Sequence, residues 1–358
     1  MWKSLKDRAE GVKEMKRMKT TEAVGQVLCH DITQIIPGVT KDAVFRKGHI
    51  IREEDIPVLL SVGKDSVYIW ENDETMMHEN DAAEVLYRMT ANEHMHPSDV
   101  KEGKIEVIAD TEGLLKVDRE KLKKVNAFGE MMIATRHGNT VVKKGDKLAG
   151  TRIIPLVIKK DKMQEAEKIC DGTPILKILP FTVKKAAIIT TGNEVYHGRI
   201  KDAFTPVIEQ KIAEFGAEMM FHEILDDNDR KITDGCLRAI EAGADIVFCT
   251  GGMSVDPDDK TPLAIKNTGA EMISYGSPVL PGAMFLLSYY RKGDKVIPIC
   301  GLPGCAMYNR RTIFDLVLPR LMAADPVTAD ELASLGEGGL CLNCKVCTFP
   351  NCGFGKGW

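Results

Sequence analysis

Residues 186–192 read Ala-Ala-Ile-Ile-Thr-Thr-Gly, an uncharged run that ends in a glycine. A short apolar run bounded by a turn residue is typical of a strand that is buried on both faces of a parallel sheet. Downstream, apolar residues recur at helical spacing from Phe204 to Phe215, with Thr205 placed to cap the helix and Pro206 suited to its first position. The sequence therefore predicts a buried strand followed by a helix.

The same alternation continues along the chain. Further strands are predicted at 219–225, 245–250, 284–290 and 295–300, and further helices at 232–240, ended by Gly243, and at 307–322. This order predicts an α/β fold, with an open, mostly parallel sheet and helices on both faces.

The preceding residues follow a different pattern. Between about 22 and 158, short apolar runs alternate with turn residues, which predicts a mixed, β-rich region with hairpins in 131–158 and a helix at 81–89. The charged stretch 159–171 is expected to be a connecting helix. We therefore expect a mixed α+β region at 1–176, the α/β domain at 177–328 and a glycine linker with a cysteine-rich tail at 329–358.

Composition excludes several classes of protein. The 358 residues suffice for two or three domains, and 44% hydrophobic with 28% charged residues is typical of folded chains. A net charge of -4 argues against nucleic acid as a partner. The charged start contains no signal-peptide core, and glycines and prolines interrupt the uncharged stretch 272–290, so we expect a cytoplasmic protein without membrane spans.

Glycines and polar residues follow each expected strand. They are Thr191, Gly192, Asn193 and Glu194 after the first strand, Asp227 after the second, Gly251, Gly252 and Ser254 after the third, and Gly301, Pro303 and Gly304 at the last. Ligands of open α/β sheets bind beyond the carboxyl ends of the strands. Glycine turns let backbone N–H groups approach a phosphate closely. A phosphate next to carboxylates would be repelled, unless Mg²⁺ lies between the phosphate oxygens and Asp227 or Asp259.

Each of these features also has a purely structural interpretation. Two adjacent glycines such as Gly251 and Gly252 form a tight turn in many proteins that bind no ligand there. Asp226, Asp227 and Asp229 are suited to cap the following helix, and Glu194 to face solvent in a turn. Four such features at four strand ends favour a ligand site over coincidence.

In order, these motifs are Thr-Gly-Asn-Glu (191–194), Asp-Asp (226–227), Thr-Gly-Gly-Met-Ser-Val (250–255), Asp-Lys-Thr-Pro (259–262) and Gly-Leu-Pro-Gly (301–304). Over residues 184–321 the chain resembles the molybdopterin-binding domain of molybdenum-cofactor biosynthesis proteins. Residues 21–70 more weakly resemble the amino-terminal part of the molybdopterin molybdotransferases.

The resemblance implies a homodimer that inserts molybdate or tungstate into molybdopterin or its adenylylated form with the help of Mg²⁺. It implies catalytic roles for Glu194, Asp227 and Asp259. The ligand-binding positions it implies are Thr191, Gly192, Asn193, Gly251, Gly252, Ser254, Pro281, Gly282, Gly301, Pro303 and Gly304.

The chain departs from the transferases at two of these motifs. Residues 280–284 read Leu-Pro-Gly-Ala-Met where the transferases carry a lysine pair, and Cys305 and Ala306 replace their asparagine and proline. Two alternatives therefore stay open beside metal insertion. One is a non-catalytic molybdopterin carrier or redox-linked sensor, with a molybdoenzyme or redox protein as partner. The other is an ADP-ribose pyrophosphatase of the competence-damage type.

Four of the ten cysteines, Cys341, Cys344, Cys347 and Cys352, form a C-x2-C-x2-C-x4-C pattern near the carboxyl end. Four thiols this close in sequence favour a metal site over two disulfides. Successive x2 spacing favours a [4Fe–4S] cluster over Zn²⁺, whose ribbons separate two C-x2-C pairs by a longer loop. The six dispersed cysteines are expected to be buried as small apolar side chains.

Overall fold

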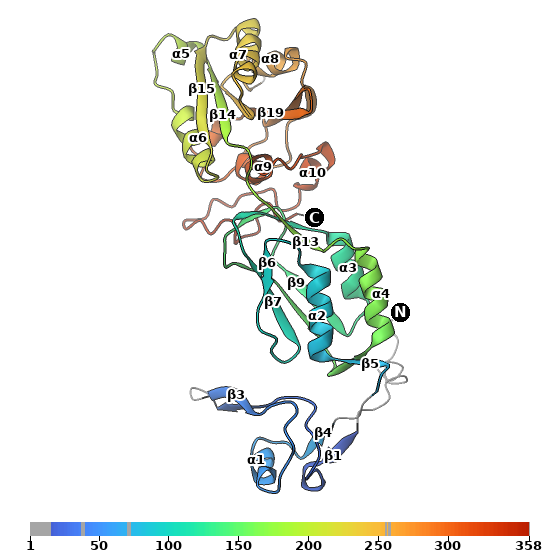
Figure 1. The fold of residues 1–358 in the computed structure, drawn as a ribbon. Coiled ribbons are helices and arrows are strands. Elements are labelled where there is room, and N and C mark those ends of the chain that lie inside the picture. Colours follow the sequence, from blue (N-terminus) through green and yellow to red (C-terminus); the bar gives the residue numbers. More distant parts are fainter. Residues whose placement is uncertain (1–15, 37–39, 70–72, 255, 257–258, 358) are drawn as a thin grey trace.

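The computed structural model describes residues 16–36, 40–69, 73–254, 256 and 259–357. The chain forms three parts that follow one another along the molecule (Figure 1). A small amino-terminal part lies at one end and a six-stranded sheet with its helices at the other, with a mixed α+β part between them. In the described residues, no helix is long and apolar enough to cross a membrane.

The amino-terminal part is held together by two small sheets. β1 (Arg17–Lys19) pairs with β4 (Ser66–Tyr68), and β2 (Ile32–Ile36) with β3 (Thr40–Phe45), both antiparallel. Helix α1 (Asp55–Ser61) contributes Leu59 to a small core with Leu28, Ile32 and Ile51. This core is separate from those of the other two parts.

The middle part contains most of the antiparallel pairing, as the sequence predicts. Its sheets have the orders β6-β7-β11-β9, β10-β8-β13 and β12-β5. Their strands are β5 (Met76–His78), β6 (Met95–Pro97), β7 (Lys104–Ala109), β8 (Gly113–Val117), β9 (Met131–Thr135), β10 (Thr140–Val142), β11 (Lys147–Ile153), β12 (Val157–Lys159) and β13 (Leu176–Leu179). Helices α2 (Glu79–Thr90), α3 (Arg119–Ala127) and α4 (Lys160–Cys170) pack with them around a shared core.

The middle part matches the sequence prediction in its helices and differs from it in its strand pairing. The helices expected at 81–89 and 159–171 correspond to α2 and α4. Within 131–158, β9 pairs with β11, whereas β10 pairs with β8 across the neighbouring sheet. Residue 177, the predicted domain boundary, lies in β13, which also pairs with β8, and the six-stranded sheet begins at Lys185. The division into domains at that residue stays a prediction.

The six-stranded sheet has the order β15-β14-β16-β19-β18-β17. Its strands are β14 (Lys185–Thr191), β15 (Glu218–Leu225), β16 (Ile246–Thr250), β17 (Glu271–Tyr275), β18 (Leu286–Lys292) and β19 (Lys295–Leu302). β15, β14, β16 and β19 are parallel, and β18 runs antiparallel to both β19 and β17. The predicted open, mostly parallel α/β sheet is confirmed.

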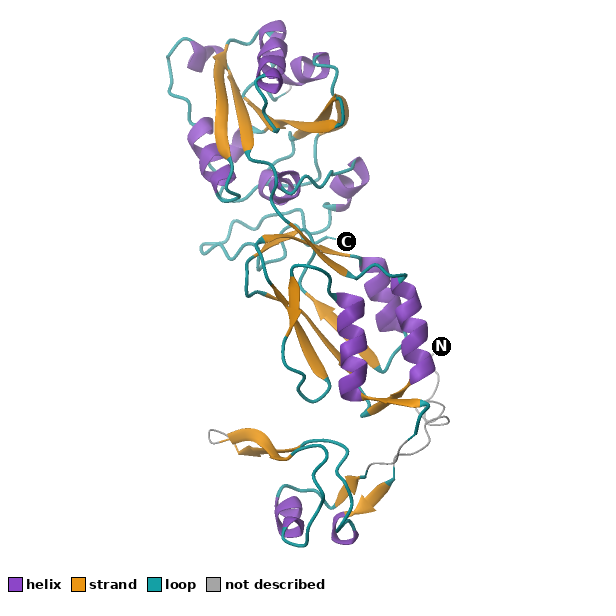
Figure 2. Ribbon diagram, viewed as in Figure 1, coloured by secondary structure: helices purple, strands orange, loops and turns teal. Residues whose placement is uncertain are grey.

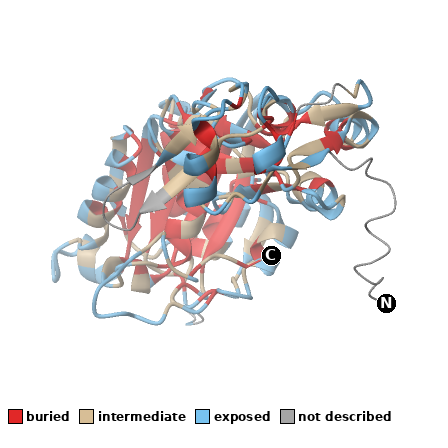
Figure 3. Cartoon of the chain, turned by 90° about the horizontal axis from the view of Figure 1, so that it is seen from below, coloured by how far each residue is buried: buried red, intermediate tan, exposed pale blue. Residues whose placement is uncertain are grey.

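Helices cover both faces of this sheet (Figure 2). On one face, α6 (Phe204–Ala213) and α9 (Ile313–Met322) pack on Ile188 and Phe248. On the other, α7 (Asp229–Glu241) and α8 (Thr261–Asn267) pack on Ile189 and Cys249. Successive strand residues point to opposite faces, so the central strands are buried on both faces. Figure 3 shows buried residues in red in the interior of the molecule.

Two helix starts differ from the sequence prediction. α6 begins at Phe204 with Ala203 in the N-cap position, and the carboxylate of Asp202, one residue earlier, accepts hydrogen bonds from the backbone N–H groups of Phe204 and Thr205. The predicted Thr205 cap is wrong, because its hydroxyl donates to Asp202 instead. α9 begins at Ile313 rather than 307, because residues Gly304–Met307 form a 3-10 turn.

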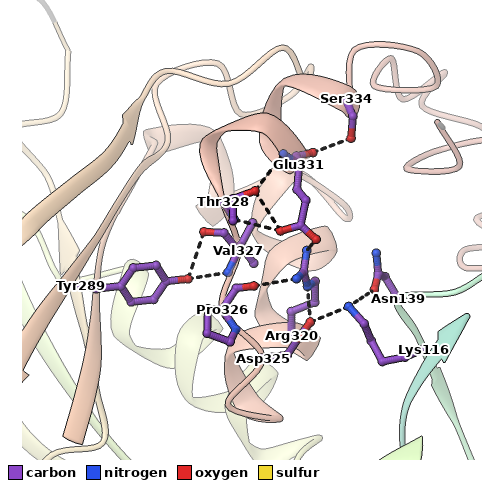
Figure 4. Close-up of polar contacts among 10 residues, drawn as sticks. All are labelled: Lys116, Asn139, Tyr289, Arg320, Asp325, Pro326, Val327, Thr328, Glu331 and Ser334. Atoms are coloured by element: carbon purple, nitrogen blue, oxygen red, sulfur yellow. Dashed lines mark hydrogen bonds and ion pairs between the residues drawn. The ribbon is translucent and has the colours of Figure 1, made fainter. Parts of the chain in front are cut away.

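The joint between the middle part and the sheet domain is polar (Figure 4). Lys116 on β8 donates to Asp325 Oδ2 at 2.8 Å, and the same carboxylate accepts from Nε of Arg320 at the end of α9. Arg320 also pairs with Glu331 on α10 (Ala329–Ser334), at 2.8 Å. One chain of charges thus connects the middle part with two helices of the sheet domain.

The tail packs back on the sheet domain. Leu280 N–H donates to the Gly339 carbonyl and Cys341 N–H to the Leu280 carbonyl, both at 2.8 Å. Phe354 is 5% exposed and belongs to the core that α6 and α9 build. In Figure 1 these loops lie between α9 and the middle part. The tail is therefore part of the sheet domain's packing.

Candidate functional site

The carboxyl ends of four parallel strands meet at one edge of the six-stranded sheet. The register places Thr190 of β14 opposite both Ile224 of β15 and Thr250 of β16, and Thr250 opposite Leu302 of β19. Tyr275, the last residue of β17, reaches the same edge, where its hydroxyl donates to the Met253 carbonyl at 3.1 Å. The residues that follow each strand are therefore neighbours, as the sequence predicts.

The turn after β16 needs both of its glycines. Gly251 has φ +82°, and a Cβ there would lie 2.1 Å from the Thr191 carbonyl oxygen. At Gly252, with φ +55°, a Cβ would lie 2.9 Å from Thr261 Oγ1. Thr261 Oγ1 also donates to the Gly251 carbonyl at 2.9 Å, and Thr191 Oγ1 to the Thr250 carbonyl at 3.0 Å. The turn is thus held tightly against β14.

The acidic side chains of the site lie next to this turn. Asp227 Oδ2 accepts the backbone N–H of Asn193 at 3.0 Å, which joins the ends of β14 and β15. Burial raises the pKa of Asp227, and the charges of Glu194, Asp259 and Asp226 raise it further. Three carboxylates therefore act on Asp227, and a cation or a proton at Asp227 would relieve this repulsion.

The capping interpretation of the three aspartates is wrong. Asn228 is the cap of α7, because its Oδ1 accepts the backbone N–H of Lys231 at 3.1 Å. Asp226 forms an ion pair with the Lys231 side chain at 2.8 Å instead, and Asp229 is the first residue of the helix. Asp227 is left to face Asn193 and the other acidic residues.

Two buried polar atoms at this edge have no partner within the described chain. They are Oγ1 of Thr250, whose residue is fully buried, and Oδ1 of Asp226. In the part of the chain that the structure describes, only Asn92 Oδ1 shares this property. An unpaired buried polar atom costs about 1–3 kcal/mol, so these two atoms make this edge locally unfavourable, and neither of them is open to solvent.

The remaining predicted positions lie around the same edge. Ser254 is exposed, and its carbonyl accepts from Tyr275 Oη at 3.4 Å. Gly301 packs against Met253, and a Cβ at Gly282 would lie 2.4 Å from Ile313 Cγ2. Pro281 accepts the Ile313 N–H through its carbonyl at 3.1 Å. Pro303 precedes the 3-10 turn that begins at Gly304, where a Cβ would meet only open space.

Sequence reasoning missed Thr261, Thr250 and Asp226 as individual residues of the site. Thr261 lies inside the Asp-Lys-Thr-Pro motif, so the motif pointed to it without giving its role. Thr250 and Asp226 are identified only by the structure, in which Thr250 Oγ1 and Asp226 Oδ1 are buried without a hydrogen-bond partner. Such atoms are visible only once the neighbours of a side chain are known.

The strand-end edge does not contain a fully protein-ligated metal site in the described residues. Among the described residues, no three His, Cys, Asp or Glu side chains are gathered so as to hold a metal ion. Mg²⁺ is usually held by one or two carboxylates together with waters and substrate phosphates.

The same finding applies to the tail. Cys341 and Cys352 are half-buried against the sheet-domain core, whereas Cys344 and Cys347 are exposed. The structure does not bring these four thiols together as a ligand set. Of the six dispersed cysteines, all but the half-buried Cys305 are buried, as expected, and none of the ten forms a disulfide.

Comparisons with known proteins divide the chain in a similar way. A family model described as "Probable molybdopterin binding domain" matches residues 187–323. A model described only as a domain of unknown function matches residues 17–71. The first match contains the strand ends and both glycines of the turn after β16.

Curated relatives match part of the chain. A "Putative competence-damage inducible protein" of Bacillus cereus (strain B4264) is 30% identical over 129 residues, which are 36% of this chain and 30% of that protein. One of Bacillus subtilis (strain 168) is 32% identical over 85 residues, 24% of this chain and 20% of that protein. The chain thus spans less than a third of the length of these relatives.

Solved structures also overlap with the chain. The tungsten cofactor synthesizing protein MoaB from Pyrococcus furiosus is 20% identical with a TM-score of 0.32, and the match covers 39% of this chain and 89% of that one. The protein CinA from Thermoplasma acidophilum is 17% identical with a TM-score of 0.31, over 39% of this chain and 98% of that one.

Proposed function

We propose that the protein binds molybdopterin, or its adenylylated form, at the strand-end edge of the six-stranded sheet, because residues 187–323 match the family model described as "Probable molybdopterin binding domain". In this proposal the protein acts in molybdenum or tungsten cofactor biosynthesis. Its activity is insertion of molybdate or tungstate, the anionic substrate, into the bound pterin. The acting form is a homodimer in the cytoplasm.

One observation carries the binding proposal. The ends of β14, β15, β16 and β19 meet at one edge, next to a glycine turn at 251–252 that leaves no room for side chains. Ligands of open α/β sheets bind beyond such strand ends. Backbone N–H groups of Gly251, Gly252 and Gly304 are available to a phosphate, because no Cβ shields them.

The acidic residues have a second role in the proposal. Asp227 and Asp259 would hold Mg²⁺, which supplies Lewis-acid polarisation of phosphate or molybdate oxygens. Asn193 orients Asp227 through its backbone hydrogen bond. Glu194, whose charge acts on Asp227, keeps the edge negative so that binding of a cation is favoured.

Two other functions are each favoured by one observation. The absence of Lys and Arg from residues 280–284 favours a carrier or redox-linked sensor that binds molybdopterin without transferring metal, because molybdate then lacks a counter-charge at that loop. The match to competence-damage inducible proteins favours an ADP-ribose pyrophosphatase.

One binding experiment separates the three. The full chain is titrated with molybdopterin, adenylylated molybdopterin and ADP-ribose, and then supplied with molybdate and Mg²⁺. Metal insertion that is lost in Asp259→Asn and retained in Asp234→Asn, an exposed position on α7, supports the transferase. Molybdopterin binding without insertion selects the carrier, and preference for ADP-ribose rejects both.

The cysteine tail is a separate part of the proposal, in which Cys341, Cys344, Cys347 and Cys352 bind a [4Fe–4S] cluster or Zn²⁺. It requires the exposed Cys344 and Cys347 to move toward the two half-buried thiols, and metal binding commonly orders its own ligands in this way. Metal analysis and absorption spectra after anaerobic purification test it. Equal metal content in wild type and in Cys344→Ser with Cys347→Ser would refute it.

A further inference from the structure

A cavity lies on the far side of helix α9 from the sheet. It has a volume of about 780 Å³. Its walls come from the β8–α3 segment, the outer side of α9 and the tail, which contribute among others Lys116, Arg119, Leu316, Phe349 and Lys356. Small-molecule sites commonly measure 300–1,000 Å³. None of Asp227, Gly251, Gly252 and Asp259 lines it, so it is distinct from the strand-end edge.

The charges on the α9 wall are matched within the protein. The Asp315 carboxylate accepts from Lys211 and, at 2.8 Å, from Arg311. Arg320 is paired with Asp325 and Glu331, as Figure 4 shows. Because these side chains neutralise one another, the α9 wall needs no ligand to balance its charges.

The opposite pole of the cavity is basic and has no acidic side chain paired with it in the described residues. Lys356 is half-buried, and its ammonium group has no hydrogen-bond or ion-pair partner among the described residues. Burial lowers the pKa of Lys356. Arg119 lies nearby and donates to the Gly357 carbonyl at 3.2 Å. Burial, followed by the charges of Lys356 and Arg119, lowers the pKa of His137.

Carboxylates do not neutralise this pole. The lining carboxylates outside the ion pairs of the α9 wall and the Asp118 cap belong to exposed residues, where water and salt screen them: Glu112, Glu120, Glu214 and Asp330. A half-buried ammonium without a partner is costly, and an anion would stabilise it.

Between the basic pole and the α9 wall the cavity is aromatic. The Arg311 guanidinium lies 4.9 Å from the centre of the Phe349 ring, and the Phe349 and Phe354 rings are 6.1 Å apart. Phe215, which follows the end of α6, also lines the cavity. Flat aromatic groups pack well on such a surface.

We propose that this cavity is a second ligand site, which binds a small anionic molecule with an aromatic body, the charge held by Lys356 and Arg119 and the ring lying against Phe349 and Phe354. The tail supplies Lys356 and both of these phenylalanines, so the site exists only when the tail is folded onto the sheet domain. It goes beyond molybdopterin binding at the strand ends and does not depend on it.

The test uses two fluorescent probes that share one ring system. 8-Anilinonaphthalene-1-sulfonate carries a negative charge, and N-phenyl-1-naphthylamine is its uncharged analogue. The full chain is titrated with each at low ionic strength. Lys356→Gln and Arg119→Gln are each expected to weaken sulfonate binding about tenfold and to leave naphthylamine binding within twofold, because only the charged contact is lost.

Lys345→Gln is the matched control, since Lys345 is an exposed lysine of the same tail that does not line the cavity. It should bind both probes like the wild type. Arg119 is exposed on α3, so its substitution leaves the fold intact even if Lys356→Gln does not. Equal sulfonate affinity in the wild type and in both cavity variants would overturn the proposal, as would an equal loss of the two probes.

Discussion

The backbone N–H of Asn193 donates to Asp227 Oδ2 at 3.0 Å and thereby joins the turns that follow β14 and β15. The pair holds Asp227 close to Glu194, Asp259 and Asp226, although burial and these charges disfavour its ionised form. A carboxylate held in surroundings that disfavour its charge does not stabilise the fold, and such groups are commonly found at binding sites.

Asp227→Asn should therefore weaken binding without weakening the fold. The amide oxygen still accepts the Asn193 N–H, and the repulsion among the acids decreases, so the thermal midpoint should not fall. Mg²⁺-dependent binding of molybdopterin should decrease about tenfold or more, because a charged ligand oxygen is lost. Calorimetric titration measures the affinity, with Asp234→Asn as the control for an exposed charge. A drop in midpoint without a change in affinity would contradict the proposed role.

Gly251→Ala should be strongly destabilising. Besides the positive φ, which costs about 1 kcal/mol in a residue with a Cβ, the new methyl group would lie 2.1 Å from the Thr191 carbonyl oxygen. Gly243→Ala is the control, since Gly243 has φ +100° with nothing within 4 Å. Urea unfolding should show a loss of about 1 kcal/mol for Gly243→Ala and at least about 3 kcal/mol for Gly251→Ala. Equal losses would mean that the turn can relax.

His78 should make stability depend on pH. The Asn80 N–H donates to Nδ1 at 3.2 Å, so Nε2 carries the proton that His78 donates to the Cys29 carbonyl at 2.8 Å. Burial is the first cause that lowers the pKa of His78. A lowered folded-state pKa means that the stability contribution is present above the unfolded value of about 6.5 and is lost as the pH falls below it.

Urea unfolding between pH 8 and pH 5 measures this dependence. His78→Gln should lose about 1 kcal/mol at pH 8, because the cap of α2 is weakened, and should show a flatter pH profile. His197→Gln, at an exposed position, should keep the wild-type slope. If His78→Gln also kept that slope, another group would have to be responsible.

The ion pair between Lys116 and Asp325 should contribute measurably to stability. Its side chains are 27% and 17% exposed, and Asp325 also accepts from the buried Arg320. Asp325→Asn should cost about 2 kcal/mol, because Arg320 loses a charged partner. Lys292→Met, which breaks a surface pair with Glu241, should cost less than about 1 kcal/mol. A double-mutant cycle of Lys116→Met with Asp325→Asn that shows no coupling would argue against the link.

The sheet domain was largely predictable because its signals are local. The apolar run at 186–189, the glycines at 251–252 and the helix ended by Gly243 each depend on backbone geometry that neighbouring residues determine. The strand ends followed from the rule for open α/β sheets. The role of the Asp202 carboxylate was missed because Thr205 had an equally good side chain for capping.

Long-range relations escaped prediction. No local pattern shows that β10 would pair with β8 rather than β9, or that Lys116 would meet Asp325, 209 positions later in the chain. The cavity beside α9 is formed by three segments that are distant in sequence: the β8–α3 segment, α9 and the tail. The thiol spacing of the tail is a local signal, but it says nothing about how Phe354 anchors the tail in a core.

The pairing of Leu280 with Gly339 and Cys341 bears on where this domain is cut for expression. The matched family segment ends at residue 323, yet Phe354 and Leu332 belong to the same apolar core as Phe314 and Val279. A fragment that stops at 323 would expose that core and leave the Leu280 N–H and carbonyl without their partners. The smallest piece expected to behave as an independent folding unit therefore starts before β14 and includes Phe354.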